Sequence, residues 1–335
     1  MFDHADAATH LLRRGLLPAT DRERASPEVR LVSGRNLLFR FAFEGAAPLL
    51  LKRAVDDETP GGLEREACAY ERIATCTDLT VARRVPRKLD YDPECSTLVL
   101  EFLPGHRPLG VRRGSGPGLD AELAADLGSV LAGLHSISPP AGDSRPPWIL
   151  TLVHPPVGIL REATREQLEL VGRVQRSSTW REALGSLTEG WRPRSFVHGD
   201  LRFSNLLIGE RRGSGGGPTL KLIDWELAGP GDPGWDVGWV VAEILVSRLR
   251  DLGEAFPLLR AFWAAYIGGP REAATHARLD STLRWAAAAS LQMAFEEAGP
   301  SYAEGVSINK LLEVGRSLLE RPEIWIERVF SAAEH

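Results

Sequence analysis

Apolar positions change their spacing along the chain near residue 104. Before this point, short runs of Leu, Val and aromatic residues are bounded by Gly, Pro or Asp, a pattern typical of β-strands. These runs occupy residues 28–33, 37–43, 48–54, 86–91 and 97–103. One segment, residues 61–75, instead repeats its apolar side chains at helical spacing, with Leu63, Ala67, Tyr70 and Ala74 on one face. The first third of the chain therefore predicts a small sheet with a single helix.

A segment rich in Pro, Gly and Arg, residues 104–118, separates this region from the remainder. After it the apolar spacing is helical, first over residues 119–137, where leucines line one face. Further helices are expected near residues 161–185, 235–250, 253–268, 277–298 and 305–320. The predicted fold class is α+β, with one domain over residues 1–103 and a second over residues 104–335.

Polar residues interrupt the second region in the stretch 196-FVHGDLRFSNLLIG-209. Residues 205–209 have strand character, a Gly-rich turn follows, and residues 220–224 predict a returning strand that ends in Asp224. In an antiparallel hairpin the first residue of the outgoing strand lies beside the last residue of the returning strand. This pairing places Asn205 next to Asp224, and Asp200 precedes Asn205 on a tight loop. The sequence thus predicts two carboxylates and an amide oxygen at one end of a hairpin.

Carboxylate and amide oxygens are ligands of hard cations such as Mg²⁺, which usually takes one or two protein oxygens together with substrate phosphates. Asn205 and Asp224 are therefore the predicted metal ligands of a nucleotide-phosphate site. Asp200 is left to orient a hydroxyl group and to take its proton. Taken singly, Asp and Asn near strand ends are more often turn formers. Their combination around one hairpin favours the site.

Composition and charge narrow the possible partners. The chain has 335 residues, 43% of them hydrophobic, a formal net charge of -5 and a pI of about 6.0, which favours neither nucleic acid nor a membrane surface as partner. No signal peptide is expected at the beginning, and no apolar run approaches the roughly 20 residues that span a bilayer. The three cysteines, Cys68, Cys76 and Cys95, form no CxxC pair. They are interpreted as reduced core thiols of a cytoplasmic protein, without a role in binding zinc.

The stretch HGDLRFSNLL, followed by LKLIDWELAGPGDPGWDVGWV, resembles the aminoglycoside phosphotransferase and choline kinase family. The resemblance is specific over residues 196–240 and looser, though in the same order, over the first third of the chain. Members of this family are small-molecule kinases with a protein-kinase-like fold. The resemblance implies two lobes, a small antiparallel-sheet lobe with one helix and a larger, mainly helical lobe that holds the catalytic and acceptor-binding groups.

In the small lobe the resemblance implies a nucleotide site. Lys52, at the end of the third strand, matches the lysine that holds the α- and β-phosphates of ATP, and Glu66 resembles its partner on the helix. An inward-pointing Glu66 needs such a cation, because an unpaired buried charge is costly. The remaining nucleotide contacts implied are a phosphate-covering loop and an adenine-binding hinge, formed by Ser33, Gly34 and Asn36 and by Glu101, Phe102 and Leu103 respectively.

In the large lobe the resemblance makes Asp200 the residue that positions the acceptor hydroxyl. Arg202 has two readings: its cation stabilises the transferring phosphoryl group, or it forms a local salt bridge. Asp236 is expected to accept backbone hydrogen bonds that brace the catalytic loop, and His198 is expected to be a packed scaffold residue. Gly199 stands where protein kinases carry the Arg that pairs with a phosphorylated activation loop, which argues against activation by such phosphorylation.

The resulting prediction is an ATP-dependent, Mg²⁺-dependent phosphotransferase that acts on a hydroxyl group of a small molecule such as an amino sugar or an amino alcohol. A kinase for Ser or Thr of a biosynthetic precursor peptide and a nucleotide-binding pseudokinase remain alternatives. The sequence does not decide between ATP and GTP or identify the acceptor. Three acidic residues are candidates for attracting a cationic acceptor: Glu296, Glu297 and Glu304.

Overall fold

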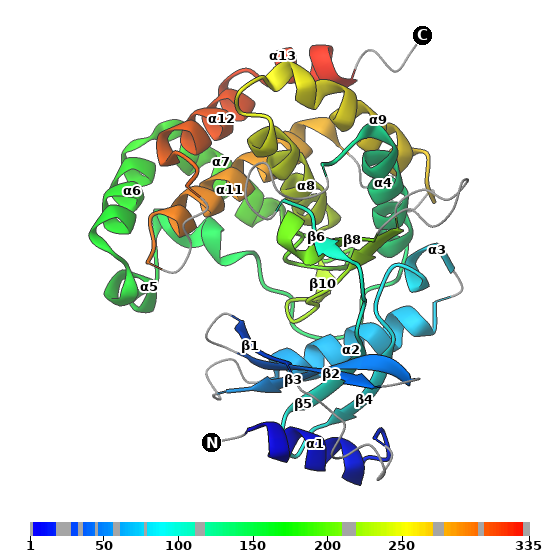
Figure 1. Cartoon of the computed structure of the whole chain (residues 1–335). Coiled ribbons are helices and arrows are strands. Elements are labelled where there is room, and N and C mark those ends of the chain that lie inside the picture. The colour runs from blue at the N-terminus through cyan, green and yellow to red at the C-terminus, as the bar shows by residue number, and fades with distance from the viewer. Residues whose placement is uncertain are drawn as a thin grey trace. The chain divides into compact units, whose positions relative to one another are not determined.

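The structure is a computed structural model that describes residues 3–17, 28–32, 36–43, 46–55, 61–76, 79–110, 118–209, 219–270, 278–300 and 305–330. It separates into two compact units (Figure 1). The first comprises Met1–Arg107 together with Ile208–Ala228, and the second comprises Pro108–Leu207 together with Gly229–His335. The described parts of this second segment, residues 208–209 and 219–228, therefore belong to the first unit, although the sequence groups them with the larger domain.

The first unit is built on a five-stranded antiparallel sheet in the order β1-β2-β3-β5-β4. Its strands are β1 (Glu28–Val32), β2 (Asn36–Phe43), β3 (Ala46–Ala54), β4 (Lys88–Asp92) and β5 (Thr97–Glu101). All five correspond to predicted strands, with bounds shifted by one or two residues. Strand β3 lies in the middle of the sheet, where Lys52 pairs with Leu38 of β2 and with Leu98 of β5.

A helix that the sequence analysis did not predict, α1 (His4–Arg13), covers one face of this sheet. Asp3 caps its first turn, and a reciprocal hydrogen bond from the Asp3 backbone to Asp6 completes a capping box. Its apolar side, including Leu11, packs against Phe41 and Leu51 of the sheet. Burial of this apolar face holds α1 on the sheet.

The opposite face of the sheet belongs to α2 (Gly62–Ala74), the helix predicted at residues 61–75. Neighbouring side chains of a strand point to opposite faces. Leu51 packs on the α1 side, and Lys52 consequently points toward α2, where it meets Glu66. The alternation along β3 thus delivers one polar side chain to a buried helix face. A short helix, α3 (Leu79–Ala82), leads from α2 toward β4.

The second unit is mainly helical. Its longer helices are α4 (Ala121–His135), α6 (Arg165–Arg176), α7 (Ser178–Gly190), α8 (Pro233–Ser247), α9 (Ala255–Ile267), α11 (Leu279–Glu297) and α12 (Ile308–Glu320). Shorter segments are α5 (Val157–Glu162) and α13 (Pro322–Trp325), with 3-10 turns between them. The single helix predicted at residues 161–185 is wrong. Ser177 ends α6 and caps α7, so the segment forms two helices.

Helices α8 and α11 approach closely, and this packing fixes the position of the N-terminal part of α8. A β-carbon on Gly238 of α8 would lie only 2.5 Å from the β-carbon of Trp285 on α11, so glycine is needed for this contact. Asp232 caps the N-terminus of α8, and Pro233 occupies the first turn. The tight packing fixes the first turn of α8, which carries Asp236.

Short strands carry the polar stretch found in the sequence. Strands β7 (Ser195–Val197) and β10 (Gly229–Gly231) form an antiparallel pair. A separate three-stranded sheet has the order β6-β8-β9, with β6 at Arg107–Pro108, β8 at Leu206–Gly209 and β9 at Thr219–Leu222. The expected pairing of β8 with β9 is confirmed, but β9 ends two residues before Asp224.

The interpretation of the cysteines as core thiols is wrong. Cys68 is exposed, and Cys76 and Cys95 are half-buried; all three are free thiols. Cys95 lies near His10 of α1 and Asp92 of β4, with its sulfur 3.8 Å from His10 Nδ1. Among the helices that the structure describes, none has the length and hydropathy to cross a membrane.

Candidate active site

A lysine bound to two carboxylates forms the polar centre of the first unit. Lys52 Nζ donates to Glu66 Oε2 and to Asp224 Oδ1, both at 2.7 Å. The side chain of Glu66 is fully buried and that of Lys52 is 9% exposed, whereas that of Asp224 is 34% exposed. Tyr70, one helical turn beyond Glu66, donates its hydroxyl to Glu66 Oε1 at 3.2 Å. Both oxygens of the buried carboxylate are therefore hydrogen-bonded.

Burial and charge compete at this centre. Burial acts to lower the pKa of Lys52, but the carboxylates of Glu66 and Asp224 outweigh it and raise the pKa above its ordinary value. Burial likewise raises the pKa of Glu66, and the ammonium of Lys52 opposes that rise. The ammonium is thus held in its charged form with its position fixed. A fixed cation next to a half-exposed carboxylate suits a triphosphate and its counter-ion.

The backbone at Asp224 adopts an unusual conformation. Its φ angle is +66°, and among the described residues other than glycine only Ser96 also has a positive φ. This left-handed region costs most L-residues energy, while Asp and Asn tolerate it best. The following residue, Trp225, is fully buried and packs edge-to-face with Tyr70. The conformation turns the Asp224 carboxylate toward Lys52 while its neighbour enters the core.

In the second unit, Asp236 braces the loop that follows β7. Its carboxylate accepts the backbone N–H groups of His198 at 2.7 Å and of Gly199 at 2.9 Å. His135 Nε2 lies 3.2 Å from the same carboxylate, and Trp235 Nε1 donates to the Gly199 carbonyl. Burial raises the pKa of Asp236, but hydrogen bonding and the charge of His135 outweigh it, so the pKa lies below its ordinary 3.8. The bracing role expected for Asp236 is confirmed, and His198 is completely buried, as expected of a scaffold residue.

Each oxygen of the Asp200 carboxylate receives a hydrogen bond within the second unit. Arg202 Nε donates to Oδ1 at 2.6 Å, and Asn205 Nδ2 donates to Oδ2 at 3.2 Å. Asn205 also donates to the Asp200 carbonyl at 2.9 Å. The two neighbours hold the carboxylate plane. The carbonyl oxygen of the Asn205 amide then remains as the atom suited to a metal ion.

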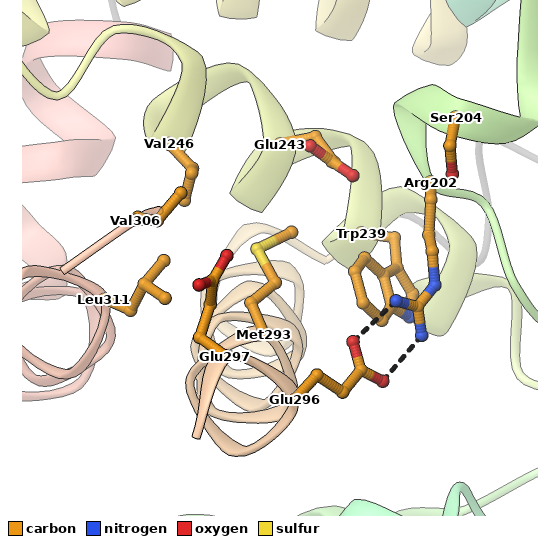
Figure 2. Close-up of a pocket in the computed structure, with 10 residues that line it drawn as sticks. All are labelled: Arg202, Ser204, Trp239, Glu243, Val246, Met293, Glu296, Glu297, Val306 and Leu311. Atoms are coloured by element: carbon orange, nitrogen blue, oxygen red, sulfur yellow. Dashed lines mark hydrogen bonds and ion pairs between the residues drawn. The ribbon is translucent and has the colours of Figure 1, made fainter. Parts of the chain in front are cut away.

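Arg202 is held by a second carboxylate and by an aromatic ring. Figure 2 shows its guanidinium facing Glu296 of α11. Nη1 and Nη2 donate to the two Glu296 oxygens at 2.5 and 2.7 Å, a bidentate pair. The guanidinium carbon lies 4.7 Å from the centre of the Trp239 ring. Of the two readings of Arg202, this geometry corresponds to the local salt bridge, because all three nitrogen atoms already donate to carboxylates.

The residues expected to contact the nucleotide are placed only in part. Ser33 and Gly34 lie outside the described residues, and Asn36 begins β2 opposite Ala54. Among the candidate hinge residues, the N–H groups of Glu101 and Phe102 donate to the carbonyls of residues 87 and 48. Adenine recognition through those two N–H groups would compete with the sheet. The backbone groups that remain for the predicted adenine contact are the carbonyls of the hinge residues and the backbone of Leu103.

The residues proposed for Mg²⁺ fit the ion chemically. Asp224 offers a half-exposed carboxylate, and Asn205 offers an amide carbonyl whose NH₂ group is already engaged by Asp200. Both are hard oxygen donors of the kind that Mg²⁺ selects. They belong to different units, Asp224 to the first and Asn205 to the second. Their predicted proximity stays a prediction.

Several contacts of the site were not predicted from the sequence. Tyr70 is an apolar-face residue by spacing, and its hydrogen bond to Glu66 follows from their separation of four residues on α2. The pairing of Arg202 with Glu296 joins residues 94 positions apart, and no local sequence signal indicates it. Glu243 of α8 is a further contact, accepting the backbone N–H of Phe203 at 3.1 Å.

Comparison with known protein families identifies the family to which the chain belongs. The model of the phosphotransferase enzyme family (APH) matches residues 28–279, which is most of the chain. The chain belongs to this family. The match spans the sheet of the first unit, the loop around Asp200 and the helix α8.

Individual relatives are more distant. The chain is 30% identical to the streptomycin 6-kinases of Streptomyces griseus and Streptomyces glaucescens, over 176 and 197 residues, which is 52% and 58% of this chain. The matched parts are 51% and 58% of those proteins, so the chain spans little more than half the length of the curated relatives it matches.

Solved structures of the same fold cover nearly the whole chain. The choline kinase LicA from Streptococcus pneumoniae aligns with a TM-score of 0.58 and 16% identity, covering 95% of this chain and all of that protein. A spectinomycin phosphotransferase in complex with ADP and spectinomycin aligns with a TM-score of 0.50 and 11% identity, covering 93% of each chain. These likenesses establish an α+β, two-lobed protein-kinase-like fold.

Proposed function

We propose that this protein transfers the γ-phosphoryl group of ATP to a hydroxyl group of a small, positively charged molecule such as an amino sugar or an amino alcohol. The observation that carries this assignment is the lysine centre, in which Lys52 is bound at once to Glu66 and Asp224. A buried lysine with one structural and one half-exposed carboxylate is suited to hold a nucleotide's phosphates beside a metal ligand. Membership of the phosphotransferase enzyme family supports the same reaction class.

In this mechanism the protein contributes position and charge. Lys52, kept charged and fixed by Glu66, would orient the α- and β-phosphates. Asp200, held at both oxygens by Arg202 and Asn205, would align the acceptor hydroxyl and accept its proton. Mg²⁺, held by Asp224 and Asn205, would supply neutralisation of the phosphate charge when bound. Phosphoryl transfer needs little covalent assistance from the protein, so positioning of the reactants and neutralisation of charge are the contributions that the reaction requires.

The nature of the acceptor is supported by the charge of a pocket in the second unit. Figure 2 shows Glu243, Glu296 and Glu297 around it, with Arg202 as the cationic residue of the lining. Glu296 is bound to Arg202, and Glu243 accepts the Phe203 N–H. Glu297 also lines the pocket, and we propose that its carboxylate attracts the cationic acceptor. Glu304, the third acidic candidate, lies outside the described residues.

The names of the related proteins agree with a small acceptor. Three of these proteins are named for streptomycin or spectinomycin, which are amino-containing sugars or cyclitols. A fourth is named for choline, which is a cationic alcohol. The spectinomycin enzyme was solved with ADP, which supports an adenine nucleotide as donor. These names favour a small molecule over a precursor peptide.

A mass-shift screen tests the proposed activity. Purified protein and MgATP are incubated separately with aminoglycosides, aminocyclitols, choline-like alcohols and Ser/Thr peptides, and the products are examined for the mass of one added phosphoryl group. The expected result is modification of a cationic small molecule, lost in Asp200→Asn. Binding of MgATP without any transfer, including to water, would instead indicate a pseudokinase. Modification of peptides alone would contradict the proposed acceptor class.

A further inference from the structure

Arg202 connects two carboxylates that lie on separate elements of the second unit. Its Nε donates to Asp200 in the loop after β7, and its two Nη atoms donate to Glu296 near the end of α11. The guanidinium is a rigid planar group, so the position of one edge determines the position of the other. The orientation of the group that contacts Asp200 therefore depends on Glu296.

Several contacts restrict the guanidinium to one orientation. The bidentate pair with Glu296 fixes its rotation within its own plane. The face of Trp239, 4.7 Å from the guanidinium carbon, fixes the plane itself. Gln292, one turn earlier on α11, donates Nε2 to Glu296 Oε1 at 3.0 Å and so orients the glutamate. Hydrogen bonds therefore connect α11 to Asp200 through Glu296 and Arg202.

Burial makes these contacts persistent. The side chain of Arg202 is 13% exposed, and those of Asp200 and Glu296 are each 19% exposed. An ion pair that is largely removed from water is screened far less than a surface pair. The attraction of Asp200 and Glu296 more than offsets the effect of burial and keeps the pKa of Arg202 well above its ordinary value.

We propose that Glu296 is a positioning residue for Asp200 and that it acts through Arg202. This role rests on the proposed function of Asp200 as the group that aligns the acceptor. Without the Glu296 carboxylate, Arg202 loses the contact that fixes its in-plane rotation. Nε then shifts away from Asp200, and the carboxylate is no longer held at both oxygens. Misalignment of this kind lowers the rate of the transfer step and leaves nucleotide affinity unchanged.

A kinetic comparison separates positioning from simple stabilisation of the fold. The reaction measured is phosphoryl transfer from MgATP to water, which requires no identified acceptor. Glu296→Gln keeps the shape of the side chain but removes its charge and one acceptor. We expect its kcat to fall by about 10- to 100-fold, the range in which small displacements of catalytic groups act. The KM for MgATP is expected to stay within about twofold, because no ATP-binding group is altered.

Glu320→Gln is the matched control. Glu320 of α12 also pairs with an arginine, Arg316, through three hydrogen bonds, but at the exposed surface. Its substitution removes the same charge and the same type of partner away from the pocket, and kcat is expected to remain unchanged. If Glu296→Gln retains the kcat of Glu320→Gln, the positioning role is overturned. Glu296→Asp, which keeps an anion, is expected to recover part of the loss and serves if the Gln variant does not fold.

A double substitution tests whether Glu296 acts through Arg202. In the Arg202→Gln background, Glu296→Gln is expected to cause no further loss of kcat, because the connecting group is already absent. If kcat of the double variant falls by the product of the two single-variant losses, the proposal is contradicted.

A nuclear magnetic resonance measurement tests the geometry without relying on turnover. The Nε–Hε signal of Arg202, identified by its disappearance in Arg202→Lys, is expected to shift in both Glu296→Gln and Asp200→Asn and to stay in place in Glu320→Gln. If the wild-type protein shows no phosphoryl transfer to any acceptor or to water, the proposed function fails. The Arg202 signal then tests by itself whether Glu296 and Asp200 are connected through Arg202. An Arg202 signal that does not respond to Glu296→Gln would overturn this connection.

Discussion

Lys52 Nζ lies 2.7 Å from Asp224 Oδ1, although the two residues are 172 positions apart in the chain. The contact exists because the described residues 219–228 belong to the first unit together with β3. Lys52 therefore binds two carboxylates of different character, buried Glu66 and half-exposed Asp224. The first carboxylate holds the lysine inside the unit, and the second is partly exposed to solvent.

Replacement of Lys52 tests this division. Lys52→Met leaves Glu66 buried without its cation, and breaking a buried ion pair in this way costs about 3–5 kcal/mol of unfolding free energy. Urea unfolding measures that loss, and phosphate release from MgATP is expected to fall below detection. In Lys52→Met/Glu66→Gln the unpaired buried charge is gone, so stability is expected to recover while phosphate release does not. A double variant as unstable as Lys52→Met would show that the charge of Glu66 is not the cause.

Replacement of Asp224 tests its proposed role as a metal ligand. Asp224→Asn tolerates the left-handed backbone but lacks the negative charge. Calorimetry is expected to show that wild-type protein binds ATP more tightly with Mg²⁺ than with a chelator, and that the variant loses this difference. Asp143→Asn, a substitution at an exposed carboxylate of the second unit, is the control and should behave as wild type. Retained Mg²⁺ dependence in Asp224→Asn would remove Asp224 from the metal site.

The same position tests the backbone conformation. Asp224→Ala and Asp224→Asn both remove the charge, but alanine tolerates a positive φ less well. The unfolding free energy of the Ala variant is expected to be lower by about 1 kcal/mol, the usual cost of that conformation. Equal stabilities in urea unfolding would show that the backbone relaxes.

The sequence predicted those helices and strands whose formation depends on the local spacing of apolar residues. Period-two and helical spacings gave the strands of the first sheet and the position of α2, because each element buries one face. The exposure of Cys68 was predictable in the same way. Cys68 does not belong to the apolar stripe of α2, which the helical spacing assigns to Leu63, Ala67, Tyr70 and Ala74.

Other features depend on contacts between distant segments. The packing of α1 on the sheet is decided by residues of β2, β3 and β5, which are distant in the chain, although Asp3 and Asp6 form a recognisable capping box. The pair of Arg202 with Glu296 has no sequence signal, because an exposed glutamate and a paired one look alike in a single chain. The resemblance supplied Lys52 and Glu66 as partners, and the structure adds Asp224 to them.

The bracing of the loop after β7 by Asp236 predicts a defined dependence of stability on pH. The pKa of Asp236 in the folded protein lies below 3.8, its ordinary value. A carboxyl with a lowered folded pKa contributes stability that is complete above the unfolded pKa and is lost as the pH falls through the folded value. Asp236→Asn is therefore expected to be less stable than wild type at pH 7, with the difference shrinking only below about pH 4. Urea unfolding of both proteins between pH 3 and 7 measures it, and a difference that is constant over this range would contradict a charged Asp236.

The acidic pocket predicts how the acceptor is recognised. Glu297→Gln removes one of three carboxylates from the lining without touching the pair of Arg202 and Glu296. For a cationic acceptor found in the mass-shift screen, KM is expected to rise about tenfold, equivalent to about 1.4 kcal/mol. The KM for MgATP is expected to stay the same, and the rise should shrink at high salt, since screening weakens partly exposed charge pairs. Glu182→Gln, the same substitution at an exposed site on α7, is the control. An acceptor KM that is equal in the two variants would exclude Glu297 from acceptor binding and leave the cation to another part of the second unit.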